Sequence, residues 1–136
     1  MAVEDLVIYQ KAFDFFIWQK SVVLHLAKVH KYSLGVEIER ETLDFLKEIV
    51  TANMARERKA ELIGRCMVSV EMLKVLFRAG YELNREGGVS IRQYGMAGEK
   101  LTELGDLCGG WFRRFQFADG SRNAGGRPYH GVSPEG

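Results

Sequence analysis

Proline is almost absent from this chain of 136 residues, which contains only Pro128 and Pro134. Because the first 127 positions lack an obligate helix breaker, we expect an all-helical body. No run of about 18 uncharged apolar residues occurs, so the sequence predicts no membrane span. The two cysteines, Cys66 and Cys108, form no CxxC pair, and the N-terminus is acidic where a signal peptide would be basic. Both features indicate a cytoplasmic protein.

An excess of charge of one sign is also lacking, since 19 Lys and Arg residues oppose 18 Asp and Glu residues. This balance excludes a chain that coats nucleic acid by bulk charge alone, but it leaves room for local basic stripes. A content of 46% hydrophobic residues is typical of one globular domain. Few apolar residues cluster from Phe117 onward. We therefore expect a bundle over residues 1–116 and a flexible Gly-rich tail over 117–136.

The first of four segments with apolar residues at helical spacing runs from Val3 to Lys28. Phe15, Trp18 and Val22 make this segment apolar on more than one side and hint at a second buried surface. The expected core face is a stripe interrupted by one lysine, formed by Leu6, Tyr9, Phe13, Phe16, Ile17, Lys20, Val23, Leu24 and Ala27.

The second helix is predicted to follow a polar connector over Val29–Gly35, with Ser33 as its N-cap. It should end where apolar periodicity lapses in the polar run 55–61. A third helix resumes at Leu62 and stops at Gly87 and the adjacent Gly88.

The start of the fourth helix carries the clearest local signal. Ser90 and Gln93 fit a capping box, and Val89 with Tyr94 fit its hydrophobic staple. This helix should end near Phe115. Four helices joined by short connectors predict an all-α, antiparallel up-down-up-down four-helix bundle.

The patterns that carry enzyme chemistry are missing. No Glu-x-x-His pair suits a di-iron bundle, and the histidines and cysteines lack zinc-site spacing. No phosphate-binding glycine loop of the GxxxxGKS/T or GxGxxG type follows a strand. The sequence therefore predicts neither an enzyme nor a metal or cofactor site.

Basic residues suggest a nucleic-acid surface. On the third helix, at 100° per residue, Arg56, Lys74, Arg78 and Arg85 fall within about 40° of one another and form a long stripe that can follow a phosphate backbone. The alternative is a solvated face, because acids stand close enough in sequence to pair with it; these are Glu57, Glu61, Glu71 and Glu82. Further candidate contacts are Arg58, Lys59, Arg65, Arg92, Arg113 and Arg114.

Glycines are frequent in the fourth helix, where each interior glycine costs about 0.5–1 kcal/mol relative to alanine. Close approach of a helix from the same chain or from another subunit would compensate for this cost. The alternative is fraying of the last turn. The residues concerned are Gly95, Gly98, Gly105, Gly109 and Gly110.

Several short motifs resemble a family of bacterial four-helix-bundle proteins. They are DLVIYQKA (5–12), HKYSLG (30–35), MLKVLFRAGYEL (72–83), QY (93–94) and ELGDLCGGWFR (103–113). The family includes the ribosomal-RNA intervening-sequence proteins and Avd, the accessory variability determinant of diversity-generating retroelements. The last three motifs are most similar to the Avd branch. Of the SIPANIAEG segment typical of the other branch, only Ala52 and Asn53 remain.

The resemblance implies a homopentameric barrel of four-helix bundles without catalytic activity. Such a protein binds the reverse transcriptase and nucleic acid, either template RNA or an RNA–DNA hybrid, and supports error-prone cDNA synthesis. This chain departs from the strongly basic Avd pattern, since acids cluster on its second helix at Glu37, Glu39, Glu41, Asp44 and Glu48. The alternatives are an interaction bundle of the intervening-sequence type without a retroelement partner, or a bundle that binds a small ligand.

Overall fold

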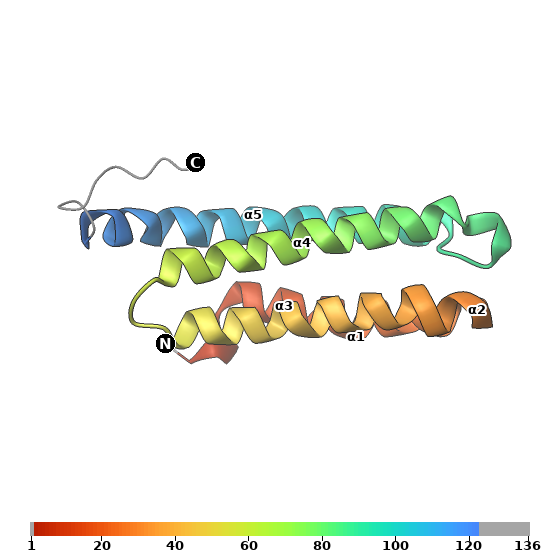
Figure 1. Cartoon of the computed structure of the whole chain (residues 1–136), viewed down its shortest axis with the longest axis horizontal. Helices are drawn as coiled ribbons and strands as arrows, with labels where there is room; N and C mark the ends of the chain where they lie inside the picture. Colours follow the sequence, from red (N-terminus) through yellow and green to blue (C-terminus); the bar gives the residue numbers. More distant parts are fainter. Residues whose placement is uncertain (1, 123–136) are drawn as a thin grey trace.

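The computed structural model describes the backbone of residues 2–122 and the side chains of residues 2–116. Four long helices run antiparallel to one another (Figure 1), and no strand occurs among residues 2–122. They are α1 (Val7–Leu24), α3 (Val36–Met54), α4 (Lys59–Glu82) and α5 (Ile91–Arg122). The short elements are η1 (Val3–Asp5), α2 (Lys28–His30), η2 (Lys31–Gly35) and η3 (Asn84–Glu86). The predicted all-α four-helix bundle is confirmed.

Each long helix packs beside its neighbours in sequence, and α5 closes the bundle against α1. Figure 1 shows the chain start, the loop between α3 and α4, and the end of α5 at one end of the bundle, which we call the loop end. The α2 segment and the connection between α4 and α5 lie at the opposite end, the hairpin end. No helix among the described residues is long and apolar enough to cross a bilayer.

Aromatic rings join diagonal helices through the middle of the core. Phe15 of α1 lies edge-on to Phe77 of α4, with ring centroids 5.9 Å apart, and Trp18 stacks on the same ring at 5.9 Å. Phe45 of α3 is also completely buried. These large side chains fill the space between the four helices, and their burial is the main source of stability in a fold of this kind.

The core face of α1 differs from the predicted stripe. The buried residues of α1 are Ile8, Ala12, Phe15, Gln19, Val22 and Val23. Of the predicted stripe, Phe13, Ile17 and Leu24 are 43%, 52% and 66% exposed. The prediction was wrong because α1 is apolar around most of its circumference, and because Gln19 places a polar residue in the centre of the true core face.

The predicted polar connector over 29–35 is helical instead. Residues of α2, η2 and α3 continue one another without a break, and Ser33 is not an N-cap, because its hydroxyl donates a hydrogen bond to the Val29 carbonyl at 2.9 Å. The chain instead turns at Ala27, whose backbone is extended and whose carbonyl accepts hydrogen bonds from the His30 and Lys31 amides. The prediction of a connector was wrong because the polar side chains of this segment lie on an exposed helix face, where polar residues are also common.

The turn between α4 and α5 follows the sequence prediction closely. Gly87 adopts a φ of +85°, which a residue with a Cβ rarely tolerates, and its carbonyl accepts a hydrogen bond from the Ala27 amide at 2.8 Å. The capping box is confirmed. The backbone amide of Gln93 donates a hydrogen bond to Ser90 Oγ at 3.1 Å, and the backbone amide of Ser90 donates one to the side-chain oxygen Oε1 of Gln93 at 3.0 Å. Tyr94 then stacks on Tyr81, with centroids 4.6 Å apart.

Several predicted helix ends need correction. The third helix spans Lys59–Glu82, so it begins before the predicted Leu62 and ends before the predicted Gly87, with η3 between its end and that glycine. The first helix spans Val7–Leu24, which is shorter than 3–28, because the chain turns before Leu6 and again after Leu24. The last helix extends beyond Phe115 to Arg122, since neither glycine nor proline interrupts residues 111–119. Residues 123–136 of the predicted tail lie outside the described part of the chain, so the division at residue 116 stays a prediction.

Candidate nucleic-acid interface

The ten candidate cations form three groups along the bundle. Arg56, Arg58, Lys59, Arg113 and Arg114 lie at the loop end, Arg65, Lys74 and Arg78 lie along α4, and Arg85 and Arg92 lie at the hairpin end. The loop end brings together the start of α4 and the last turns of α5, since Lys59 Nζ lies 5.2 Å from the Phe115 ring centroid.

The predicted four-residue stripe does not form on one helix. Arg56 lies in the loop before α4, and Arg85 lies in η3 beyond its end. Only Lys74 and Arg78 share a helix, because the regular 100° step that aligned all four residues stops at the two ends of α4. The third helix is shorter than that alignment required.

Acidic neighbours pair with the cations of α4 and its first turn. Lys74 Nζ lies 3.2 Å from Glu71, and Arg78 Nε lies 2.9 Å from Glu82. The spacing of three and four residues in the sequence signalled these pairs, and the laced face that we considered as the alternative is present. The Lys74 side chain is 42% exposed and the other three are more than half exposed. Exposed pairs of this kind contribute only about 0–1 kcal/mol, so a phosphate can replace the carboxylate at little cost.

Glu61 forms ion pairs with two further arginines near the start of α4. Arg58 binds it with two hydrogen bonds, from Nε at 2.9 Å and Nη2 at 2.7 Å, and Arg65 lies 3.5 Å away. The hydrogen bond from Arg58 lowers the pKa of Glu61, and the same bond raises the pKa of Arg58. Arg58 is therefore held by a bidentate contact and is the least available of the exposed cations for phosphate.

Lys59 serves a structural role at the loop end. Its ammonium donates a hydrogen bond to the Asn53 carbonyl at 3.1 Å and lies against the Phe115 ring. These contacts tie the start of α4 to the end of α3 and to α5. Its half-buried side chain is thus committed within the bundle.

Five arginines remain exposed and form no ion pair with a described side chain. Three of them lie at the loop end and two at the hairpin end; they are Arg56, Arg113, Arg114, Arg85 and Arg92. Among the ten candidate cations, the exposed ones without an ion pair therefore lie at the two ends of the bundle and not along the middle of α4.

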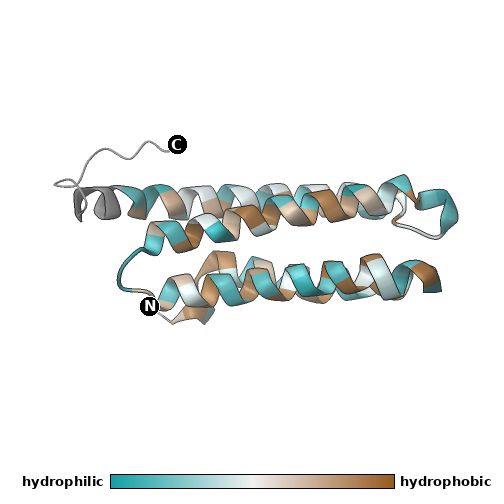
Figure 2. Cartoon of the chain, in the orientation of Figure 1, coloured by the Kyte–Doolittle hydropathy of each residue, from teal (hydrophilic) through white to brown (hydrophobic). Residues whose placement is uncertain are grey.

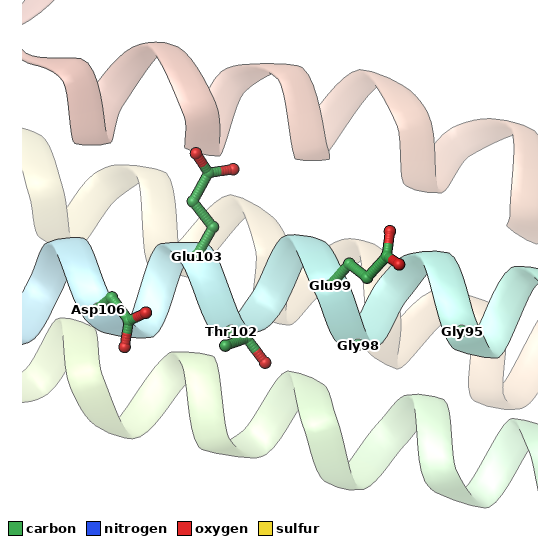
Figure 3. A pocket seen from close by; sticks show the side chains of 6 residues that line it. All are labelled: Gly95, Gly98, Glu99, Thr102, Glu103 and Asp106. Atoms are coloured by element: carbon green, nitrogen blue, oxygen red, sulfur yellow. The ribbon is translucent and has the colours of Figure 1, made fainter.

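A shallow hollow of about 510 Å³ lies along the outer side of α5 (Figure 3). Three carboxylates and two glycines line it together with a threonine; they are Glu99, Glu103, Asp106, Gly95, Gly98 and Thr102. A site of this charge repels phosphate, so the hollow lies outside the candidate interface. Glu103 also forms an ion pair with Lys11 of α1 at 3.3 Å.

The glycines of α5 differ in what surrounds them. A Cβ at Gly95 or Gly98 would meet no described atom within 4 Å, so no helix of the same chain approaches them, and they are too far from the end of α5 for fraying. At Gly105, by contrast, a Cβ would lie 3.7 Å from Val70 of α4. The Arg113 guanidinium lies 3.4 Å from the Cβ position of Gly109.

A polar contact in the α3–α4 interface involves Glu48 and Ser69. The Ser69 hydroxyl donates a hydrogen bond to Glu48 at 2.5 Å, while burial, with Glu41 and Asp44 adding repulsion, raises the pKa of Glu48. No group of three potential metal ligands occurs among the described residues.

Both cysteines lie buried on facing helices. Burial raises the pKa of the Cys66 thiol strongly and that of Cys108 to about 12. Both thiols are therefore protonated at neutral pH and lack the thiolate that a nucleophile or a metal ligand requires.

Comparison with known proteins identifies the fold with one family. No curated protein and no solved structure is significantly similar to the chain. The model of the bAvd-like family matches residues 6–115, which include α1, α3, α4 and most of α5. This chain therefore belongs to the bAvd-like family.

Proposed function

We propose that this protein is a non-catalytic accessory factor of a diversity-generating retroelement. It binds the reverse transcriptase and nucleic acid, either template RNA or an RNA–DNA hybrid, and supports mutagenic cDNA synthesis. Membership of residues 6–115 in the bAvd-like family is the observation that carries the proposal. The bundle itself acts as a rigid support for charged surfaces.

The unpaired arginines at the bundle ends are the proposed phosphate contacts. Arg56, Arg113 and Arg114 lie together at the loop end, where a guanidinium can bind phosphate through two donors. Lys74 and Arg78 add to them when phosphate displaces Glu71 and Glu82. Phosphate contacts carry no sequence information, so specificity comes from RNA shape and from the reverse transcriptase held beside it.

A homopentamer, which the family resemblance implies, multiplies these contacts. One subunit presents too few free cations for tight binding in physiological salt. Each phosphate that a cation neutralises changes the slope of log K against log salt concentration by only about 0.9, so a few contacts release few counterions. A closed ring presents five copies of each arginine to one nucleic acid. The affinity then rises through effective concentration without any new contact.

RNA binding titrated across a range of salt concentrations tests the interface. We expect Arg113→Gln with Arg114→Gln to weaken binding about tenfold or more and to reduce the salt slope. Lys74→Glu with Arg78→Glu should weaken it as well, because it replaces two exchangeable cations by acids. Arg40→Gln with Lys47→Gln removes two positive charges from α3, as many as Arg113→Gln with Arg114→Gln, and should leave binding unchanged. Unchanged affinity and slope in both test variants, with the assembly intact, would contradict the proposed interface.

The reverse-transcriptase partner is tested separately. The gene should lie beside a reverse-transcriptase gene and paired template and variable repeats, and the purified protein should co-elute with that enzyme in size-exclusion chromatography. An interaction bundle of the intervening-sequence type would lack both the neighbouring gene and the complex. This second test does not depend on which arginines contact RNA.

A further inference from the structure

The connection from α1 to α3 carries positive charge without acidic neighbours in sequence. Residues 15–36 contain no aspartate or glutamate, the longest such interval in the chain, and include Lys20, Lys28 and Lys31. Lys20 pairs with Glu39, whereas Lys28 and Lys31 form no ion pair with a described side chain. The α2 segment and the start of η2 therefore present free positive charge at the hairpin end, where hydrophobic and hydrophilic residues lie next to one another (Figure 2).

An exposed aromatic ring lies in the same segment. Tyr32 of η2 is 70% exposed and forms no ring contact or hydrogen bond with a described residue. Phe13, the next most exposed aromatic among the described side chains, is 43% exposed and lies against the rings of Tyr9 and Phe16. Both faces of the Tyr32 ring are thus open to a ligand.

The neighbours of Tyr32 fix the direction of its side chain. A Cβ at Gly80 of α4 would lie 3.2 Å from Leu34, so Leu34 points into the bundle. Tyr32 comes two residues earlier, about half a turn around the helix, and points outward. At 100° per residue, Lys28 and Lys31 lie on one side of the ring and Val29, which is 71% exposed, lies on the other.

The segment that carries the ring is fixed to the rest of the bundle. The backbone amide of Ala27 donates a hydrogen bond to the Gly87 carbonyl at 2.8 Å, which joins the two turns of the hairpin end. A Cβ at Gly35 would lie 2.9 Å from Val23, so α1 packs closely on η2. A ring on such a rigid support loses little conformational freedom when a ligand covers it.

Packing accounts for only part of the HKYSLG motif at residues 30–35. Leu34 and Gly35 pack against α4 and α1, and the Ser33 hydroxyl donates a hydrogen bond to the Val29 carbonyl. Lys31 and Tyr32 have no such role within the described bundle. The motif also forms the π-helical segment η2, and single π-helical turns are frequent at functional sites.

The size of the apolar patch indicates a small flat ligand. An aromatic side chain offers roughly 150–250 Å², and Val29 adds less than that. A stable protein interface buries roughly 800 Å² per partner, which is several times more. One ring with an aliphatic neighbour instead matches the face of a single nucleobase, and the lysines beside it match the charge of the phosphates.

We propose that the hairpin end binds an unpaired nucleotide, with its base stacked on Tyr32 and the adjacent phosphates held by Lys28 and Lys31. This site rests on the proposed nucleic-acid binding and adds base contact to it, since the arginines of the candidate interface contact phosphate. Aromatic rings beside free cations are the usual means by which proteins bind single strands. Paired bases hide their faces in the duplex stack, so the ring selects single-stranded nucleic acid.

The lysines are within reach of the phosphates that such a base would bring. Side chains four residues apart on a helix have Cβ atoms about 5–6 Å apart, and the ammonium of Lys28 extends further on a flexible four-carbon stem. Arg85 lies two residues before Gly87 and so beside the Ala27–Gly87 hydrogen bond. It extends the positive surface from α2 toward the end of α4, along which the strand can continue.

Binding to three RNA probes separates base contact from phosphate contact. The probes are an unstructured single strand of about 20 nucleotides, the same strand with abasic sites, and a blunt duplex of equal length. Tyr32→Leu keeps an apolar side chain but removes the ring. It should weaken binding of the unmodified strand about fivefold to a hundredfold and leave the abasic strand and the duplex unaffected. Tyr32→Phe keeps the ring and should bind like the wild type.

The salt dependence tests the lysines. Lys28→Gln with Lys31→Gln should weaken single-strand binding and reduce the slope of log K against log salt concentration by about 1.4 for each subunit that the strand contacts, because each phosphate of a single strand contributes about 0.7. Tyr32→Leu should leave this slope unchanged. Arg40→Gln with Lys47→Gln removes the same number of charges from α3 and should alter neither affinity nor slope.

Three results would overturn the stacking site. Wild-type affinity of Tyr32→Leu for the unmodified strand, with Arg113→Gln and Arg114→Gln still weakening it, would show that the ring does not contact the base, while the proposed function stands. An equal loss on all three probes would show that Tyr32 does not act by stacking. Equal wild-type affinity for the abasic and the unmodified strand would exclude base contact altogether. Failure of the wild-type protein to bind any probe would instead refute the proposed nucleic-acid binding itself.

Discussion

At the scale of single residues, Gln19 breaks the rule that buried polar groups are satisfied. It is completely buried in the bundle core, its Nε2 donates to the Phe16 carbonyl at 3.1 Å, and its Oε1 accepts no hydrogen bond from a described residue. An unsatisfied buried oxygen costs about 1–3 kcal/mol. Gln19 thus stabilises the fold less than an apolar side chain of its shape would.

We therefore expect Gln19→Met to raise the free energy of unfolding by about 1 kcal/mol, because the new side chain keeps the unbranched shape and removes the unsatisfied oxygen. Urea unfolding monitored by circular dichroism measures the change. As a control, Gln19→Glu buries a carboxylate and should destabilise the fold strongly. A lower midpoint for Gln19→Met would mean that the amide has a partner in solution.

Glu48 makes the stability depend on pH. Because burial raises its folded-state pKa, the folded state binds more protons than the unfolded state between the two pKa values. Its contribution to stability is therefore fully present below about 4.3, the ordinary pKa of glutamic acid, and is lost as pH rises through the raised value.

Glu48→Gln should remove this loss while keeping an acceptor for Ser69. Its free energy of unfolding should change less with pH above about 4.3 than that of the wild type, and at neutral pH it should be at least as stable. Urea unfolding at a series of pH values compares the two proteins. A variant that is clearly less stable at neutral pH would contradict this account of Glu48.

At the scale of elements, the start of α5 depends on two reciprocal hydrogen bonds. We expect Ser90→Ala to cost about 1 kcal/mol, because the Gln93 amide loses its acceptor. Gln93→Ala should cost less alone, and the double variant should cost less than the sum of the two because both bonds belong to one motif. A double-mutant cycle in urea provides the measurement, and strict additivity would show that the two side chains act independently.

Glycines in α4 and α5 should respond in opposite ways to alanine. Gly98→Ala should stabilise an isolated subunit by about 0.5–1 kcal/mol, since its Cβ meets no described atom within 4 Å. Gly80→Ala should destabilise it, because the Cβ would lie 2.5 Å from Val89 in the α4–α5 turn. Thermal unfolding of both variants is the test. Destabilisation by Gly98→Ala would reveal a close neighbour at that position.

At the scale of the whole molecule, the net charge of +1 is the sum of basic, acidic and apolar surfaces that lie in different places. Free arginines lie at the bundle ends, and the α5 hollow is acidic. Phe13 and Ile17 of α1 and Leu43 of α3 are large exposed apolar side chains on neighbouring helices and form the α1/α3 face. The surface expected to take part in association and the arginines proposed for nucleic-acid binding are therefore different. They can be disrupted separately, although avidity links their outcomes.

If the proposed homopentamer uses the α1/α3 face, Ile17→Glu should convert it into a monomer of 15.4 kDa, because the variant places an unpaired charge in the centre of that face. RNA affinity should fall at least about tenfold in the same variant, since each monomer retains only its own arginines. Multi-angle light scattering and fluorescence anisotropy report the two effects. Asp14→Lys, on the other side of α1, should preserve the assembly, and an unchanged mass for Ile17→Glu would exclude this face from the interface.

The sequence by itself determined the elements whose signals are local. The lack of proline before residue 128 and four helical periodicities predicted the all-α bundle, and Ser90 with Gln93 marked the start of α5. Gly87 likewise marked the turn between α4 and α5, since its positive φ suits glycine, although α4 itself ends at Glu82. These signals act through the backbone of a few adjacent residues, so they hold whatever the rest of the chain does.

Tertiary structure alone decided which surfaces face the core and which charges remain free. Phe13 and Phe15 are equally apolar, and only the positions of α3, α4 and α5 bury the second and expose the first. The length of α4 likewise decided that Arg56 lies in a loop and Lys74 beside Glu71. Hydrophobic burial is non-directional, so a helix that is apolar on several sides takes its inner face from its neighbours.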